Sequence, residues 1–290
     1  MALSNLAARV LFALVAIPVT LGAVYLGDVT LSLLLSLVSA VAAWEFFRLA
    51  SAGGYEPLPG VGIPLAALLP LAVHAYRIGR FTPPILALGA TSVLAVFALT
   101  IWLRGPARRP IGAAAATVFG VLYTGGMLCF GYALRYHNYT VGAPAGTALL
   151  LYPLLLTWTS DTGAFAVGRA LGRRKLIPSV SPGKTVEGAL GALALSALVS
   201  WLYARLLLTR FAELGLAPWS AVLFGLAISV AVQLGDLAES LIKREVGAKD
   251  SSHLIPGHGG VLDRIDGMIF ALPTAYLLFT LPRFLLPVIR

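Results

Sequence analysis

Charged residues are scarce in this chain of 290 residues: Asp, Glu, Lys and Arg make up 11% of it, whereas 59% of its residues are hydrophobic. Its mean hydropathy is +0.89, and apolar runs of about 20 residues, the length that spans a bilayer as a helix, recur along it. Backbone polar groups that face lipid must be satisfied internally, which favours helices. The composition therefore excludes a water-soluble globular protein and predicts an all-α, polytopic integral membrane protein.

Cysteine is nearly absent as well. Cys129 is the one cysteine and lies inside an apolar run, which excludes a disulfide framework within the chain and indicates a small buried hydrophobic residue. The net charge of +9 comes from Lys and Arg scattered through short loops between apolar runs. Contact with anionic headgroups and membrane orientation explain such a pattern better than nucleic-acid binding, so no nucleic-acid partner is predicted.

The apolar runs predict about nine transmembrane helices. They are expected at residues 9–27, 29–47, 59–76, 83–103, 111–134, 146–168, 186–208, 217–238 and 268–287. No small-x-small cleavage site closes the first run, so it is interpreted as a retained helix and not as a signal peptide.

The distribution of basic residues predicts the orientation of these helices. With a cytoplasmic N-terminus and nine spans, two-thirds of the 21 Lys and Arg residues lie on the cytoplasmic side. This bias predicts a cytoplasmic N-terminus and an external C-terminus. We expect the protein to lie in the cytoplasmic (inner) membrane, with loops 169–185 and 239–267 on the cytoplasmic side.

Acidic residues are rare in the first half of the chain. Only Asp28, Glu45 and Glu56 precede position 160, and the other nine follow it. We therefore expect a transmembrane scaffold of about five spans in residues 1–140 and a catalytic half in residues 141–290. No internal repeat is visible, which gives no support to a duplicated transporter architecture.

A first polar cluster, around Ser160 and Asp161, interrupts the sixth predicted span. A carboxylate at membrane depth needs a partner or a watery cavity. We expect this cluster to form the wall of an aqueous pocket that contacts metal or nucleotide. Hydrogen bonding to a neighbouring helix for packing is the alternative.

A second cluster precedes the seventh span and contains a Gly-Lys-Thr triplet. It fails the phosphate-loop pattern because a proline stands where the first glycine belongs. Ser181, followed by proline, predicts a helix N-cap, and such a helix start offers free backbone N–H groups to an anion, with Lys184 adding a charge. Thr185 and Glu187 are expected to lie at the mouth of the same site, although capping alone would explain Ser181.

A third cluster, residues 240–266 (here the signature segment), contains four basic residues, four acidic residues and two histidines. If the eighth span continues as a helix, Asp236, Ser240, Lys243 and Arg244 share one face. That face carries a carboxylate, a hydroxyl and two cations toward the same side.

The end of the signature segment combines glycines with carboxylates. Gly259 and Gly260 would let backbone N–H groups approach phosphates closely, and Asp263 and Asp266 stand three residues apart before the last span. Aspartate oxygens suit Mg²⁺, which binds through a few carboxylates plus substrate phosphates. Zinc is disfavoured because the histidines have no nearby cysteine and no helical H-x-x-x-H spacing.

These residues together resemble the phosphatidate cytidylyltransferase (CDP-diacylglycerol synthase) family. The signature segment matches the family pattern S-x-apolar-K-R, K-D, H-G-G-apolar-x-D-R-apolar-D, and the S-D-T-x-A and S-P-x-K-T-x-E-G elements match at 160–164 and 181–188. Specific motifs match in the C-terminal half of the chain, whereas the N-terminal half resembles the family only in its general hydrophobic character. The chain departs slightly at Ser252 and Gly267, where members more often have other small residues.

The resemblance implies transfer of CMP from CTP to phosphatidic acid, with CDP-diacylglycerol and pyrophosphate as products. It implies Mg²⁺ as cofactor, a second cation as an open alternative, and a homodimer. The implied metal ligands are Asp236 and Asp263 first, then Asp266 and Asp161. The implied catalytic side chains are Lys184, Lys243, Arg244, Lys249, His258 and Arg264. The implied substrate-binding residues are Ser160, Ser181, Thr185, Glu187, Ser240, Asp250, His253, Gly259 and Gly260.

Two other functions stay open. A CTP-dependent lipid kinase of the dolichol type would attack the γ-phosphorus of CTP on a similar scaffold. An ion transporter would use Asp161 and Asp236 as a gate, but the charges gather at one interface and do not follow a path across the membrane.

Overall fold

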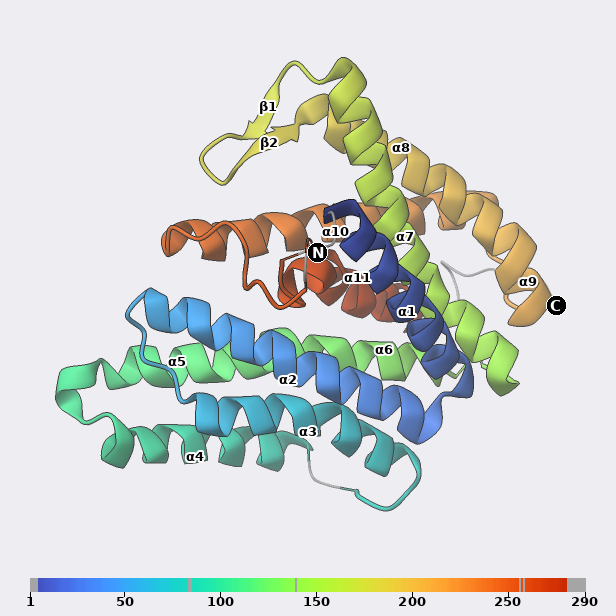
Figure 1. Cartoon of the computed structure of the whole chain (residues 1–290). Coiled ribbons are helices and arrows are strands. Elements are labelled where there is room, and N and C mark those ends of the chain that lie inside the picture. The colour runs from blue at the N-terminus through green and yellow to red at the C-terminus, as the bar shows by residue number, and fades with distance from the viewer. Residues whose placement is uncertain (1–4, 83–84, 139, 256, 258, 281–290) are drawn as a thin grey trace. The chain divides into compact units, whose positions relative to one another are not determined.

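The structure, a computed structural model, describes residues 5–82, 85–138, 140–255, 257 and 259–280, with the backbone alone for residues 5–9 and 85–87. Helices dominate it (Figure 1). They are α1 (Asn5–Leu26), α2 (Asp28–Ala52), α3 (Pro59–Arg77), α4 (Ile85–Leu103), η1 (Pro106–Arg108), α5 (Pro110–Val121), η2 (Leu122–Gly126), α6 (Met127–Arg135), α7 (Gly142–Leu171), α8 (Val186–Tyr203), η3 (Ala204–Leu208), α9 (Thr209–Phe211), α10 (Pro218–Glu245) and α11 (Leu262–Thr280). Two short strands, β1 (Lys175–Ile177) and β2 (Ser181–Thr185), pair between α7 and α8.

The prediction of an all-α membrane protein is confirmed. Each predicted span overlaps a helix, although residues 83–84 and 281–287 of the fourth and ninth spans lie outside the described residues. Within the described ranges, five helical stretches are long and apolar enough to cross a bilayer: Asp28–Ala52, Pro59–Arg77, Pro110–Arg135, Val186–Phe211 and Pro218–Glu245. The total of nine spans stays a prediction.

The chain forms two compact units, each described here by itself. The first comprises the described parts of Met1–Ala23, Gly27–Tyr132 and Ile242–Arg264. The second comprises Val24–Leu26, Ala133–Leu241 and the described part of Ile265–Arg290. Most of the signature segment therefore belongs to the unit that contains α2 to α5.

Aromatic side chains and small residues hold the helices of the first unit together. Phe46 of α2 lies edge-on to Phe47, with ring centroids 5.7 Å apart, and both rings occupy the space beside Gly120 of α5. A side chain at Gly125 would collide with the backbone of Ala66 in α3. Gly125 thus allows α3 to approach closely, as small residues at membrane helix crossings do.

Three connections meet at one end of the first unit. Arg104, which follows α4, donates to the backbone carbonyls of Glu56 and Pro57 at 2.8 and 2.6 Å. Tyr55, in the same connection, donates to Glu245 at the end of α10. Alternating spans place these three connections on one side of a membrane, which agrees with the predicted topology; that this side is cytoplasmic stays a prediction.

Small residues also create the helix crossings of the second unit. A side chain added to Gly163 of α7 would come within 2.8 Å of the carbonyl of Gly191 in α8, and one added to Gly225 of α10 would meet Ser200 of α8. Because the crossings are so close, α7, α8 and α10 position their polar residues with little freedom.

The predicted helix start at Ser181 is wrong. Residues 181–185 form β2, which pairs with β1 in the register Lys175↔Thr185 and Ile177↔Ser181. Helix α8 begins at Val186, and the Thr185 hydroxyl caps it by accepting from the N–H of Gly188 at 3.1 Å. Strand pairing provides backbone hydrogen bonds to residues 181–185. A helix that began at Ser181 would instead include Gly183 in its first turn, and glycine has a low helix propensity.

Candidate active site

A cavity of about 440 Å³ opens in the second unit and brings residues of the first two polar clusters together with Asp236. Ser160 and Asp161 reach it from α7, Lys184 and Thr185 from β2, and Asp236 from α10. The aqueous wall predicted for Ser160 and Asp161 therefore has a structural counterpart. Concave pockets with a few convergent polar groups are the usual form of small-molecule sites.

An ion pair lies in this cavity. The ammonium of Lys184 is 2.7 Å from Oδ2 of Asp236, and these side chains are 24% and 37% exposed. Ser240, one turn further along α10, donates to Oδ1 of Asp236 at 3.4 Å. The predicted shared helical face of Asp236 and Ser240 is thus present.

Glu187 has a different surrounding from the one expected. Its carboxylate accepts from the backbone N–H groups of Arg173 and Arg174 at 3.0 and 3.1 Å. Glu187 thereby connects the first turn of α8 to the residues between α7 and β1. A substrate-binding role for Glu187 stays a prediction.

Asp263 is the centre of a hydrogen-bond network in the first unit. Its Oδ1 lies 2.7 Å from the ammonium of Lys243. Its Oδ2 accepts from the N–H and the hydroxyl of Ser251, both at 2.9 Å, and from the N–H of Gly260 at 2.7 Å. The Lys243 and Asp263 side chains are only 11% and 5% exposed, so each neutralises the other in a buried place, as buried charges require.

Glu45 is a residue that sequence reasoning missed. This carboxylate of α2 is fully buried and accepts from the hydroxyls of Ser251 and Ser252 at 3.1 and 2.5 Å. It also accepts from the N–H groups of Val261 and Leu262 at 3.0 and 2.6 Å. Those amides begin α11 and have no partner within their own helix, so a carboxylate is favoured there.

Glu45 thus joins both ends of the loop that carries the signature glycines. A signal for this role was available, because Glu45 is an acid within an apolar span, and such residues need a partner. The sequence did not identify the partner, since Ser252 lies 207 positions away.

The signature glycines lie against these carboxylates. A side chain at Gly260 would overlap the Ser251 hydroxyl and the Glu45 carboxylate, and Gly259 has φ +84° beside Asp263. Only glycine adopts such a φ freely and allows so close an approach. In the structure the Gly260 amide donates to Asp263, and contact with a phosphate stays a prediction.

The other predicted residues lie mainly on the surface. His258 lies outside the described residues. Ser160 is buried and bonded to Ser229 at 2.9 Å, and Oδ1 of Asp266 accepts from the N–H of Gly267 at 2.7 Å. The exposed members of the set are Arg244, Lys249, Asp250, His253 and Arg264.

The carboxylates of the candidate set are the side chains that could bind a metal ion. Among the residues that the structure describes, no three His, Cys, Asp or Glu side chains gather into one metal-binding group. Asp236 and Asp263 nevertheless each hold a lysine ammonium at 2.7 Å, so both oxygens accept a cation. Each carboxylate by itself is a type of ligand that Mg²⁺ uses, because this ion takes its remaining ligands from water and phosphate.

Comparison with known proteins identifies the family. A sequence model described as "Cytidylyltransferase family" matches residues 7–281. The phosphatidate cytidylyltransferase of Bacillus subtilis is 31% identical over 94% of this chain and 97% of its own length. That of Pseudomonas aeruginosa is 34% identical over 91% and 93%.

A third relative matches more strongly over a shorter region. The phosphatidate cytidylyltransferase of Haemophilus influenzae is 46% identical over 149 residues, which is 48% of each chain. This match spans about half the length of that relative. Because the family model extends over nearly the whole sequence, this chain belongs to the cytidylyltransferase family.

Proposed function

We propose that this chain is a phosphatidate cytidylyltransferase, which transfers CMP from CTP to phosphatidate and releases pyrophosphate. The names of the relatives support these substrates. The geometric observation that supports the reaction best is the cavity of the second unit, where Lys184, Asp236 and Asp161 converge. A nucleoside triphosphate and a metal ion both require such a mixture of cation and carboxylate.

The proposed reaction is an attack by a phosphatidate oxygen on the α-phosphorus of CTP. The bond from the α-phosphorus to the bridging oxygen breaks, and pyrophosphate leaves with the electron pair. A phosphomonoester has a second pKa of about 6 and is mostly dianionic at neutral pH, so no strong protein base is needed. Positioning and neutralisation of two polyanions are then the main tasks.

The side chains proposed for these tasks are basic. We assign neutralisation of the phosphates to the five basic residues of the candidate set: Lys184, Lys243, Arg244, Lys249 and Arg264. Lys184 and Lys243 contact carboxylates in the structure, and a bound phosphate would compete for them. The same contacts hold both ammonium groups in defined positions before substrate binds.

We propose that Asp236 and Asp263 hold Mg²⁺, with Asp161 and Asp266 as further candidates. When bound, Mg²⁺ would supply positive charge that offsets the negative charge of the phosphates. Asp263 would contribute Oδ1, the oxygen that faces the Lys243 ammonium, while Ser251 and Gly260 hold its other oxygen in place. We place the site at the cytoplasmic side of the inner membrane, and the proposal of a homodimer rests on the family resemblance alone.

The test incubates purified protein in detergent with phosphatidate, Mg²⁺ and CTP labelled at the α-phosphorus. We expect a labelled lipid and free pyrophosphate, and no labelled lipid after addition of EDTA. A lipid kinase would instead leave the label in CDP. Release of labelled CDP, or no turnover of CTP, would refute the proposed reaction.

Asp236→Asn tests the metal assignment most cleanly, because Asp236 is partly exposed and its loss leaves the buried network of Asp263 intact. We expect loss of at least about 100-fold in kcat. Asp263→Asn should be equally inactive, but it also removes the negative charge beside the buried Lys243 ammonium, so its thermal unfolding must be measured in parallel. Glu213→Gln is the control, because Glu213 is an exposed acid outside the cavity. Full activity in both Asp variants would overturn the metal assignment.

A further inference from the structure

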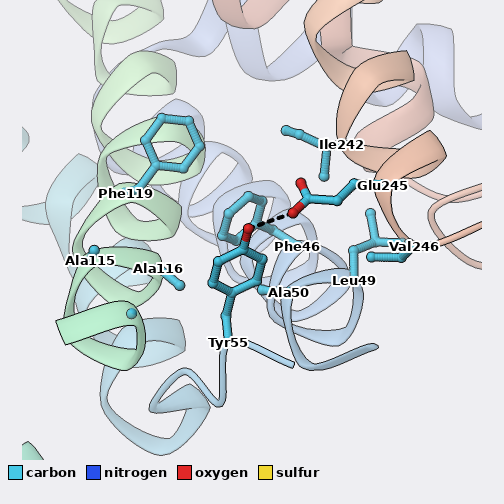
Figure 2. A pocket seen from close by; sticks show the side chains of 11 residues that line it. Phe46, Leu49, Ala50, Tyr55, Ala115, Ala116, Phe119, Ile242, Glu245 and Val246 are labelled. Carbon is cyan, nitrogen blue, oxygen red and sulfur yellow. Dashed lines mark hydrogen bonds between the residues drawn. The ribbon is translucent and has the colours of Figure 1, made fainter. Parts of the chain in front are cut away.

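A second cavity, of about 390 Å³, lies in the first unit and has no role in the reaction described so far (Figure 2). It lies between the C-terminal end of α2, residues 112–119 of α5 and the last turn of α10. Figure 2 shows the rings of Phe46 and Phe119 and the aliphatic side chains of Leu49, Ile242 and Val246 around it. Its lining is almost entirely hydrocarbon.

The sequence of α5 explains the hollow. Gly112, Ala115, Ala116 and Phe119 recur at helical spacing and form one face of α5. Three of these four residues are small, so the face leaves space where larger side chains would fill it. Ala115 and Phe119 are exposed, which indicates that the cavity opens sideways from the helices.

One polar pair stands at the cavity. Tyr55 donates to the carboxylate of Glu245 (Figure 2). This hydrogen bond raises the pKa of Tyr55 above its usual range, so the phenol stays protonated at neutral pH and remains the donor. The charge of Glu245 repels an anion, and a phosphate group is therefore excluded from the cavity itself.

Cations lie around the cavity instead. Arg109 is close enough to Tyr55 for its charge to oppose the rise in the Tyr55 pKa. On α10, Lys243 follows the cavity residue Ile242 directly and pairs with Asp263. Since an α-helix rises only about 5.4 Å per turn, a ligand that rests on Ile242 and Val246 lies within one turn of Lys243.

We propose that this cavity holds an acyl chain of the phosphatidate substrate, with the lipid phosphate outside it near Lys243. The inference rests on the proposed function and adds a site for its lipid substrate. The cavity matches an anionic glycerolipid that enters from the bilayer. Its hydrocarbon interior suits the acyl chain, its carboxylate keeps the phosphate outside, and the cations beside it attract that phosphate.

Shape, and not the hydrophobic effect, is the expected source of selectivity. The acyl chain moves from the hydrocarbon of the bilayer to the hydrocarbon of the cavity and does not leave water, so the hydrophobic effect contributes little to its binding. The dimensions of the cavity then decide which acyl chains fit. Filling the cavity should alter the preference among phosphatidates and leave the use of CTP unchanged.

Ala116→Phe fills the cavity and tests this expectation. We measure kcat/KM in mixed micelles for phosphatidates with short (octanoyl) and long (oleoyl) chains at equal surface fractions. Overpacking of a fitted site costs about 1–3 kcal/mol, so the long-chain substrate should lose about tenfold in kcat/KM. The short-chain substrate should change less than about twofold, with an unaltered KM for CTP.

Ala95→Phe on α4 is the matched control, because it makes the same exchange in another apolar helix at an alanine that does not line the cavity. It should retain the wild-type chain preference. Phe119→Ala enlarges the cavity and serves as a second variant if Ala116→Phe does not fold; it should improve the use of chains bulkier than oleoyl.

A direct measurement does not depend on turnover. Phosphatidate with a photoreactive diazirine in its acyl chain should crosslink to residues of α5 in the wild-type protein, and unlabelled phosphatidate should compete. Phosphatidylglycerol with the same diazirine chain distinguishes a substrate site from a site for any anionic lipid. Equal crosslinking of both lipids would overturn the proposal.

The two proposals fail in different ways. If CDP-lipid forms but no crosslink reaches α5, or Ala116→Phe keeps the wild-type chain preference, the acyl-chain site is refuted and the reaction stands. If the wild-type protein forms no CDP-lipid from any phosphatidate, the proposed function fails, and with it the identification of the occupant as substrate.

Discussion

A single buried carboxylate organises the signature segment of the first unit. Glu45 accepts four hydrogen bonds, two from serine hydroxyls before the glycine-containing loop and two from the amides that start α11. We therefore regard Glu45 as a positioning residue that holds Asp263 and Gly260 in their places.

Glu45→Gln should lower kcat by about 10–100-fold, the usual effect of losing a group that orients a metal ligand. Each carboxylate oxygen accepts two hydrogen bonds, so the amide nitrogen of glutamine would face donors that it cannot satisfy. We expect a higher Mg²⁺ concentration for half-maximal activity, with a nearly unchanged KM for CTP. A merely structural role would lower thermal stability without moving the Mg²⁺ dependence.

The control for this change is Glu56→Gln. Glu56 is also an acid of the first unit, but its side chain is 44% exposed and lies 3.9 Å from Arg104 and Arg108. Exposed pairs of this kind contribute about 0–1 kcal/mol, so this variant should retain its activity. Wild-type Mg²⁺ dependence in Glu45→Gln would contradict the assigned role.

At the scale of elements, the crossing of α7 and α8 places the cavity residues. Gly163 lies against Gly191 and Ala192, and this contact lies between Asp161 on α7 and the hairpin that carries Lys184. Helices in membranes associate through such close packing because the hydrophobic effect drives little association there. The crossing therefore determines the distance between the two walls of the cavity.

Gly163→Val should destabilise the protein by about 1–3 kcal/mol, since its side chain must displace the α8 backbone. We expect a lower unfolding temperature in detergent and reduced CTP turnover. Gly89→Val on α4 is the control, because among the described residues no atom outside its own stretch of helix lies within 4 Å of the position that its Cβ would occupy. Equal stability of the two variants would show that the crossing tolerates a wider separation.

At the scale of the whole molecule, the arrangement of the basic loops makes the orientation testable. In a Cys129→Ser background, single cysteines replace exposed arginines at Arg80, Arg108 and Arg173. The predicted topology places Arg80 outside and the other two in the cytoplasm. A membrane-impermeant maleimide should therefore label Arg80→Cys on intact cells and the other two only in inverted vesicles.

The reverse labelling pattern would place the cavity of the second unit on the side without nucleotides, and CTP could not then be the substrate in the cell. Labelling of all three positions from one side would disprove the alternation of spans between them. Activity of each variant with CTP controls for correct folding.

Much of this protein could be predicted from the sequence because the relevant signals are local. Each span predicted from an apolar run overlaps a helix of the structure, since burial in lipid leaves the backbone few alternatives. Contiguous spacing likewise indicated the family, which the family match confirmed. The N-cap at Ser181 failed because the pairing of residues 181–185 with β1 competes with helix formation.

Sequence patterns were enough to predict the membrane class, the main helices and the polar side chains from which a site can be built. The pairing of those side chains depends on the fold: Lys184 contacts Asp236, Lys243 contacts Asp263, and Glu45 contacts a loop 207 positions away. Such pairings depend on helix crossings that are set by side-chain volumes on several helices at once, and no local pattern along one segment contains that information.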